Sequence, residues 1–440
     1  MERSDERDSA LMGTDINLTI GGISLASFTN QTGIDFGHLF QESDRTRRKM
    51  DKVNYVYYDD NPDKTAESDV SEMVFARRLD RVCPRIELLS HSLESARSEY
   101  QSIVAETLQL DSYLELPDGL PLLSFEEFCA LACRYPLGEL SDAYVEGDTP
   151  DCNKAAQGRF ADDADEFARL PSIHYYHLYY SEKSYLSQRL CILSPESMLL
   201  VFAQNPANAD IEVVWEFGPL VNNDWARIED FQAGARRVQK VLIATEGASD
   251  VRIIKRALEV LRPDVADFFY FIDADSRHHF WGTGNLVKFA ESLLRIDIQN
   301  KVLFVLDNDV EGVDAYRKLA TLPLRGNMRA MLLPNLEAFT SFPVRGPEGD
   351  SLADINGRAA AIECYLDLDL PAYGAALVIW SNYKKEVATW HGALEFKESY
   401  LRHFYDQSDD ALRNGPYQST KLAKLLDKLI AESKLFSSAT

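Results

Sequence analysis

Between residues 240 and 334, short apolar runs alternate with amphipathic stretches, and this alternation limits the fold more than any other feature of the sequence. Short apolar runs bounded by turn residues are typical of buried strands, whereas apolar residues three and four positions apart mark one face of a helix. The predicted strands are residues 240–245, 267–273, 301–307 and 328–334. The predicted helices are residues 249–262, 284–296 and 312–320. Strands that alternate with helices form βαβ units, so we expect a parallel sheet and an α/β fold in the C-terminal half.

The N-terminal half has a different pattern, and we expect a mixed, mostly helical α+β domain there. Residues 14–29 alternate apolar and polar side chains around Gly21-Gly22, which predicts a β-hairpin. Ser124 precedes an apolar stripe and predicts the start of a helix over residues 124–135. The remaining predictions are helices over 74–109 and 175–201, a strand over 211–217, a charged helix or loop over 42–52 and a turn-rich stretch over 140–167.

Composition narrows the class of protein. The chain has 440 residues, which suits two or three domains, and its net charge is −24. General nucleic-acid binders usually have a basic surplus, so the charge argues against one, although an enzyme needs only a local basic track. No apolar run is long enough to cross a membrane and the charged N-terminus lacks a signal-peptide core, so we expect a cytoplasmic protein. The six cysteines form no CxxC pair, and Cys129 and Cys133 are expected to be reduced core thiols.

Acidic residues follow three of the predicted strands. Glu246 follows the first strand, Asp273 and Asp275 follow the second, and Asp307 and Asp309 follow the third. Ligands of open α/β sheets collect outside the carboxyl ends of the strands. Carboxylates gathered there repel one another unless one is protonated or a cation such as Mg²⁺ lies between them. The spacing of Asp307 and Asp309 suits two carboxylates that share one cation.

Two neighbouring residues have other expected roles. Asp250 is expected to be a first-turn helix residue favoured by the helix dipole rather than a ligand. Gly312 is expected to let the chain turn into the following helix.

The segments ATEGASD (244–250) and LDNDVEG (306–312), in their βαβ setting, resemble a Toprim domain over roughly residues 238–335. Toprim domains are the Mg²⁺ modules of type IA and type II topoisomerases, bacterial primases and several nucleases. The resemblance implies a Rossmann-like parallel sheet and a Mg²⁺ cofactor, with Mn²⁺ as a substitute. It implies that Asp307 and Asp309 are metal ligands, that Glu246 is a catalytic acid/base or metal-organising residue, and that Gly247 lets the backbone approach the substrate.

The flanking segments are similar to the bacterial HEPN/Toprim-associated family. Residues 16–44 resemble its N-terminal region, and residues 354–369 resemble the stretch that follows its Toprim core. The resemblance implies three parts: an N-terminal region over 1–235, a Toprim catalytic domain over 236–340 and a helical C-terminal extension over 341–440.

Three further site residues are candidates. In related nucleases a late glutamate is a metal ligand, which implies that role for Glu363; the alternative is an ordinary glutamate on a helix surface. Lys397 resembles a late lysine of Toprim nucleases that orients phosphate or offsets charge in the transition state. Arg277, in the loop after the second strand with His278 and His279, is a candidate for phosphate binding.

Together these features predict a Mg²⁺-dependent nuclease that hydrolyses DNA or RNA, and the resemblance implies a conditional role such as anti-phage, antiviral defence. The expected partners are nucleic acid and a separate protein chain, with no membrane; a homodimer is left open. No P-loop motif is present, so any ATPase partner would be another chain.

Three alternatives stay open. The first is a non-catalytic Toprim module that binds a nucleotide or nucleic acid. The second is a haloacid-dehalogenase-like phosphatase with Asp307 as nucleophile, which would expect Thr or Val in place of Glu311. The third is a second active site, because Arg169 and His174 have the spacing of a HEPN ribonuclease pair, although the surrounding tyrosines favour a packing role.

Overall fold

The computed structural model describes most of the chain. The described residues are 15–29, 31–49, 71–109, 121–145, 150–171, 179–222, 225–272, 282–296, 298–370, 372–385 and 388–436. The chain divides into two units, residues 1–234 and residues 235–440. Among the described residues, no helix is long and apolar enough to cross a membrane.

The first unit is built on a five-stranded antiparallel sheet with the order β2-β1-β5-β4-β3. Its strands are β1 (Asp15–Ile20), β2 (Ile23–Thr29), β3 (Arg45–Lys49), β4 (Ser71–Arg78) and β5 (Glu212–Glu216). The predicted hairpin is confirmed as β1 and β2, and the turn between them needs glycine because Gly21 and Gly22 have φ angles of 56° and 84°. The strand predicted over residues 211–217 is confirmed as β5.

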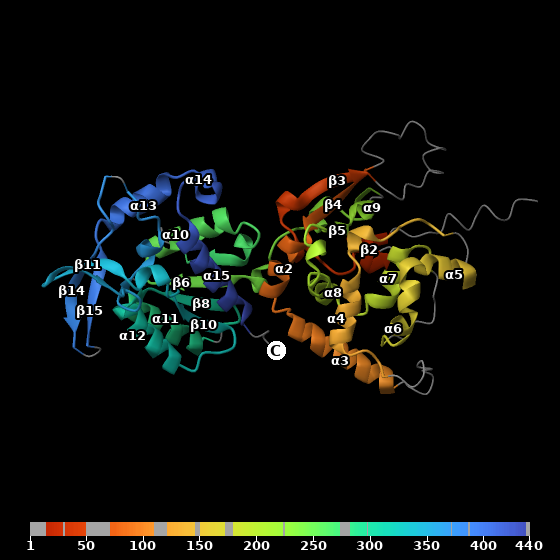
Figure 1. The fold of residues 1–440 in the computed structure, drawn as a ribbon, viewed down its shortest axis with the longest axis horizontal. Coiled ribbons are helices and arrows are strands. Elements are labelled where there is room, and N and C mark those ends of the chain that lie inside the picture. The colour runs from red at the N-terminus through yellow and green to blue at the C-terminus, as the bar shows by residue number, and fades with distance from the viewer. Residues whose placement is uncertain are drawn as a thin grey trace, which may run out of the picture. The chain divides into compact units, whose positions relative to one another are not determined.

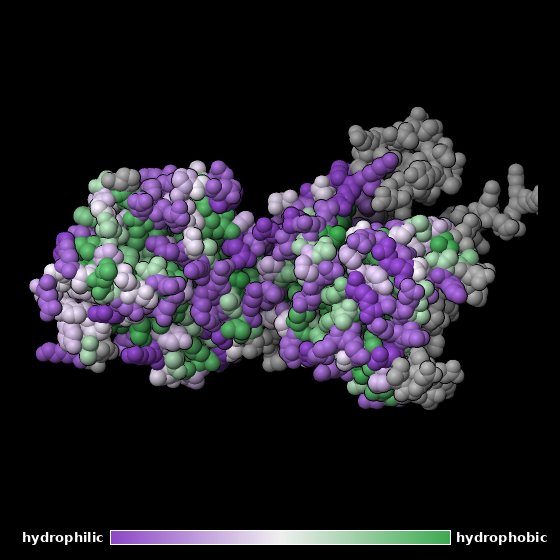
Figure 2. All heavy atoms as spheres, in the orientation of Figure 1, coloured by the Kyte–Doolittle hydropathy of each residue, from purple (hydrophilic) through white to green (hydrophobic). Residues whose placement is uncertain are grey.

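Two predictions in this unit are wrong. Residues 42–52 were expected to be a helix or loop, but residues 45–49 form the edge strand β3. The helix predicted over 74–109 begins only after strand β4. The charged residues of β3 suit an edge strand, where charge discourages pairing with other chains, and Figure 2 shows hydrophilic residues along this strand. Residues 71–78 pair with β5 and β3 in the sheet, and the local sequence does not reveal pairing between segments so far apart.

Helices cover the sheet of the first unit. They are α2 (Leu79–Leu88), α3 (Leu93–Gln109), α4 (Phe125–Arg134), α5 (Pro150–Gln157), α6 (Ala164–Ala168), α7 (Glu182–Leu190), α8 (Pro195–Phe202) and α9 (Gly218–Asn222). The predicted start of α4 is confirmed, since Ser124 Oγ accepts a hydrogen bond from the Glu127 amide at 3.2 Å. The stretch expected to be turn-rich, 140–167, contains α5 and most of α6. All six cysteines are free thiols, and Cys129 and Cys133 are partly buried.

The second unit contains the predicted parallel sheet, with the order β10-β8-β6-β7. Its strands are β6 (Val241–Thr245), β7 (Phe269–Phe271), β8 (Lys301–Leu306) and β10 (Met328–Leu332). The crossover helices are α10 (Ala248–Leu261), α11 (Thr283–Arg295) and α12 (Val310–Thr321). Figure 1 shows β6, β8 and β10 side by side in this unit. The α/β prediction is therefore confirmed, and β6 and β8 are neighbours with Thr245 beside Val305.

The end of the chain is mixed rather than wholly helical, contrary to the expectation for residues 341–440. A second sheet has the order β12-β11-β14-β15, and a short pair joins β13 to β9. These strands are β9 (Asn308–Asp309), β11 (Phe342–Gly346), β12 (Gly349–Ala353), β13 (Ala359–Ala360), β14 (Val378–Lys384) and β15 (Thr389–Leu394). The last helices are α13 (Lys397–Asp406), α14 (Asp409–Asn414) and α15 (Thr420–Lys434). Helices α14 and α15 pack against α10, so this segment belongs to the same unit as the parallel sheet.

Candidate functional site

The carboxyl ends of β6 and β8 bring the first two acidic residues together. Because these strands are parallel neighbours in register, Glu246 and Asp307 each follow their strand at the same edge of the sheet. The Asp307 backbone amide donates a hydrogen bond to Glu246 Oε1 at 3.3 Å. The sequence prediction that both residues lie at the same strand ends is therefore matched by a direct contact.

Asp307 and Asp309 are held by different backbone donors. Asp307 Oδ1 accepts a hydrogen bond from the Ile362 amide at 2.9 Å. Asp309 caps helix α12, since its Oδ1 accepts from the Gly312 amide at 2.8 Å. The second oxygen of Asp309, Oδ2, lies 3.3 Å from His391 Nε2 of β15. The two aspartates therefore occupy one region while their oxygens turn to separate partners.

Asp250 has a larger part in this region than its sequence position suggests. Its Oδ2 accepts a hydrogen bond from the Gly247 amide at 3.0 Å, so it does stabilise the start of α10 as expected. It is also only 9% exposed, and it interacts electrostatically with Glu363, Asp307 and Glu246. The interpretation of Asp250 as only a helix-start residue is therefore incomplete.

Glu363 is not a glutamate on a helix surface. It lies in a short 3₁₀ turn, residues Ile362–Tyr365, and is 6% exposed. Lys397 Nζ at the start of α13 lies 3.9 Å from Glu363 Oε1, with about half of the lysine side chain exposed. The structure thus brings together Glu363 and Lys397, which sequence reasoning had named separately.

We call the five acidic residues of this region the carboxylate cluster: Glu246, Asp250, Asp307, Asp309 and Glu363. Burial, followed by the charges of Asp309 and Asp250, raises the pKa of Glu246 to about 8. Burial, followed by the charge of Glu363, raises the pKa of Asp250 to about 7. Burial and the other four carboxylates raise the pKa of Asp307 well above its usual range. Collected negative charge of this kind favours uptake of protons or of a cation.

The chemistry of the cluster suits a hard divalent cation, because carboxylate oxygens are the ligands that Mg²⁺ prefers. Within the described part of the chain, however, no three His, Cys, Asp or Glu side chains are arranged as a ready-made metal site. Four of the five carboxylates direct an oxygen to a backbone amide: Glu246, Asp250, Asp307 and Asp309. A cation bound here would share those oxygens with the amides or turn a side chain away from its amide.

The two glycines of the site differ in what surrounds them. A Cβ atom on Gly312 would lie 2.0 Å from the Asp307 carbonyl oxygen, so a close approach of backbone requires this glycine. This close approach lies where the chain turns from β8 into α12, as expected for Gly312, and it does not depend on a positive φ angle. A Cβ on Gly247 would meet nothing closer than Ser249 Oγ at 3.6 Å. Close packing therefore explains the glycine at position 312, whereas a Cβ at position 247 would make only ordinary van der Waals contacts.

Several sequence candidates lie outside the described residues. They are Asp273, Asp275, Arg277, His278 and His279 after β7, and His174 in the first unit.

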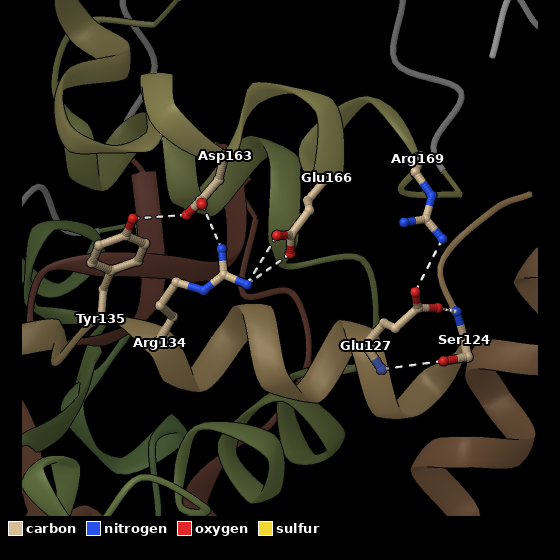
Figure 3. A network of polar contacts seen from close by, with 7 residues as sticks. All are labelled: Ser124, Glu127, Arg134, Tyr135, Asp163, Glu166 and Arg169. Atoms are coloured by element: carbon tan, nitrogen blue, oxygen red, sulfur yellow. Dashed lines mark hydrogen bonds and ion pairs between the residues drawn. The ribbon is translucent and has the colours of Figure 1, made fainter. Parts of the chain in front are cut away.

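Arg169 of the suggested Arg–His pair is described and has structural contacts. Its Nε donates to the Pro121 carbonyl oxygen at 2.8 Å, and a terminal nitrogen donates to Glu127 Oε1 at 3.1 Å. Figure 3 shows Arg169 joined through Glu127 to Ser124, beside a second group in which Arg134 contacts Asp163 and Glu166. These contacts tie Arg169 to the start of helix α4.

Sequence reasoning missed two residues of the site. Asp250 could have been found, because a carboxylate three positions after Gly247 on the strand–helix turn faces the same edge as Glu246. His391 carried no local signal, because it is 82 residues from Asp309 and reaches it only through the second sheet.

Comparison with known protein families gave one match. A family model described as HEPN/Toprim N-terminal domain 1 matches residues 12–239, just over half of the chain. No curated protein and no solved structure matches the chain. The matched residues end shortly before β6, so the carboxylate cluster lies in the remainder of the chain.

Proposed function

The chain belongs to the HEPN/Toprim N-terminal domain 1 family, and from that premise we propose that its second unit is a divalent-cation-dependent nuclease with a Toprim active site. The observation that carries the proposal is the carboxylate cluster. Its members come from three separate parts of the chain, around residues 246–250, 307–309 and 363, and meet at the carboxyl edge of a parallel sheet. Ligand sites of open α/β sheets lie at this edge.

Asp307, Asp309 and Glu246 are the proposed holders of one Mg²⁺, with Mn²⁺ as a substitute, and Glu363 is the proposed ligand of a second ion. When bound, such an ion polarises the scissile phosphate and lowers the pKa of an attacking water. Asp250 adds a fourth carboxylate within electrostatic reach of Asp307.

The other residues have roles that follow from their own chemistry. The family resemblance implies that Glu246 either organises the metal or acts as a general acid or base; burial and the charges of Asp309 and Asp250 raise its pKa in the cation-free protein, and a bound cation would displace its proton. Lys397 places a positive charge beside Glu363 and can contact a phosphate oxygen, because about half of its side chain is exposed. Gly247 is only partly buried, and the absence of a side chain there would let a substrate approach its backbone.

The proposal is tested by incubating the purified full chain with Mg²⁺ or Mn²⁺ on plasmid, single-stranded DNA and tRNA. Cleavage should disappear in Glu246→Gln and Asp307→Asn. Asp314→Asn is the matched control, because Asp314 is an exposed acid of α12 that pairs with Lys318. Binding without cleavage under either metal would contradict the nuclease.

A second candidate is a non-catalytic module that binds a nucleotide or nucleic acid. It is favoured by one observation, the engagement of four carboxylates of the cluster with backbone amides in place of a ready-made metal site. The same assay separates the two candidates. A conditional role such as anti-phage defence, with a separate partner chain, remains part of the proposal and rests on the family resemblance alone.

A further inference from the structure

Two aromatic side chains form an exposed pair beside the start of helix α13. The ring centroids of Tyr373 and Phe396 are 4.7 Å apart, with their planes inclined by 36°. Tyr373 is 37% exposed and Phe396 is 50% exposed. The Tyr373 hydroxyl lies 3.0 Å from Ser399 Oγ of α13, which fixes the tyrosine against this helix. The pair is thus an ordered aromatic surface open to solvent.

Phe396 has an unusual backbone conformation in addition to its exposed side chain. Its φ and ψ angles of 57° and 27° lie in the left-handed region, which bulky residues rarely adopt. Such strain persists where the surroundings enforce it, and it concentrates at functional sites. Phe396 therefore combines backbone strain with a ring that is only half-buried, and core packing accounts for neither.

The aromatic pair is tied to the carboxylate cluster through the next residue. Lys397 follows Phe396 directly, and its Nζ lies 3.9 Å from Glu363 Oε1. The first turn of α13 therefore carries an aromatic surface and a cation that reaches the cluster. A nucleotide presents the complementary pair of features side by side: a flat base that can stack on an aromatic ring and a negatively charged phosphate that can contact a cation.

We propose that Tyr373 and Phe396 stack an unpaired base of the substrate while the adjoining phosphodiester contacts Lys397 beside the carboxylate cluster. This inference rests on the proposed nuclease function and names its substrate class, single-stranded nucleic acid or unpaired segments of it. Exposed aromatic rings bind successive unpaired bases by stacking, whatever the base, whereas a base inside a duplex is already stacked.

The net charge of the protein also favours single-stranded nucleic acid over a duplex as the substrate. Binding of duplexes depends mainly on many contacts between phosphates and basic side chains. A chain with a net charge of −24 is poorly suited to that mode. Stacking on aromatic rings draws on the flat faces of the bases rather than on positive charge, and the half-exposed Lys397 beside the pair supplies a local cation for one phosphate.

The test compares fluorescein-labelled oligonucleotides as single-stranded DNA, single-stranded RNA and blunt duplex, using the full chain. Phe396→Leu removes the ring but keeps an apolar side chain, and Phe396→Tyr restores a ring. Tyr383→Ala is the matched control, because Tyr383 is 45% exposed and pairs with Trp390, whereas His391 pairs with Asn382. Tyr383 therefore lies on the strand face opposite to the histidine that contacts the cluster.

We expect Phe396→Leu to raise the Kd and KM for single strands by roughly 5- to 100-fold, the usual loss of one stacked base, with a smaller change in kcat. Phe396→Tyr should restore binding, and Tyr383→Ala should leave it unchanged. The DNA and RNA arms identify which strand is preferred. Thermal melting of each variant checks that the fold is kept.

The outcomes separate the inference from the proposed function. Loss of single-strand binding in Phe396→Leu without cleavage by any metal form supports the stacking site and contradicts the nuclease. Cleavage of duplex and single strands alike, with KM unchanged in Phe396→Leu, overturns the stacking site and leaves the nuclease. An equal loss in Phe396→Leu and Tyr383→Ala also overturns it, because the effect would not be confined to the pair.

Discussion

The backbone amide of Asp307 donates a hydrogen bond to Glu246 Oε1 across 3.3 Å, although 61 residues separate the two in sequence. The contact exists because β6 and β8 are parallel neighbours in register. It fixes the direction of Glu246 before any ligand binds. Glu246 is therefore the member of the carboxylate cluster whose replacement is most informative.

Glu246→Gln should stabilise the cation-free protein while it removes the response to Mg²⁺. The neutral amide no longer opposes Asp309 and Asp250, the carboxylates that raise the pKa of Glu246 together with burial. The gain in the free energy of unfolding at pH 8 should be on the order of 1–4 kcal/mol. Thermal melting in EDTA, with and without added Mg²⁺, measures both effects. A lower Tm for the variant in EDTA would argue against repulsion in the cluster.

The stability of the cation-free protein should fall as pH rises from about 4.5 to about 8. The pKa of Glu246 is raised in the folded protein from 4.5 to about 8, so in this window the folded state holds a proton that the unfolded state has lost. Asp250 acts in the same direction up to about pH 7. Melting curves in EDTA across this range provide the measurement, and Glu246→Gln is the control with a shallower slope. A melting temperature that does not change with pH would show that the carboxylates of the cluster are not buried close to one another.

His391→Ala should weaken the site through Asp309. His391 Nε2 lies 3.3 Å from Asp309 Oδ2 and helps to orient that carboxylate. Loss of a residue that orients a metal ligand typically costs about 10- to 100-fold in metal affinity or activity. The half-saturating Mg²⁺ concentration for cleavage is the readout. His403→Gln is the control, because His403 contacts Gln407 and Tyr417 instead, and equal effects of both changes would refute the role of His391.

The substitutions Gly312→Ala and Gly247→Ala should have different effects: the first should lower stability, and the second should lower activity while the fold is kept. Gly312→Ala should lower the free energy of unfolding by about 1–3 kcal/mol or more, because its Cβ would overlap the Asp307 carbonyl oxygen. Gly247→Ala should keep or raise stability, by up to about 1 kcal/mol, since its φ of −145° suits alanine and the added Cβ would meet its neighbours only at ordinary van der Waals distances. Nuclease assays should nevertheless show lower activity for Gly247→Ala. Full activity in that variant would contradict close approach of substrate to Gly247.

Local patterns were enough for much of the second unit. The alternation of apolar strands and amphipathic helices correctly predicted β6, α10, β8 and α12, because strand and helix periods are properties of neighbouring residues. The same logic placed Glu246, Asp307 and Asp309 at strand ends. It failed for β3 and β4, whose strand conformation depends on pairing within a sheet.

The sequence by itself determined the acidic strand ends, the α/β order and the hairpin turn at Gly21-Gly22. Only the tertiary structure decided that Asp250 and Glu363 join the cluster and that His391 and Lys397 reach it. The reason is physical: β6 and β8 become neighbours through their register, and the segment that carries Glu363 is held to Asp307 by the Ile362 amide, 55 residues away. Contacts between segments so far apart depend on the packing of whole elements, and no local periodicity encodes them.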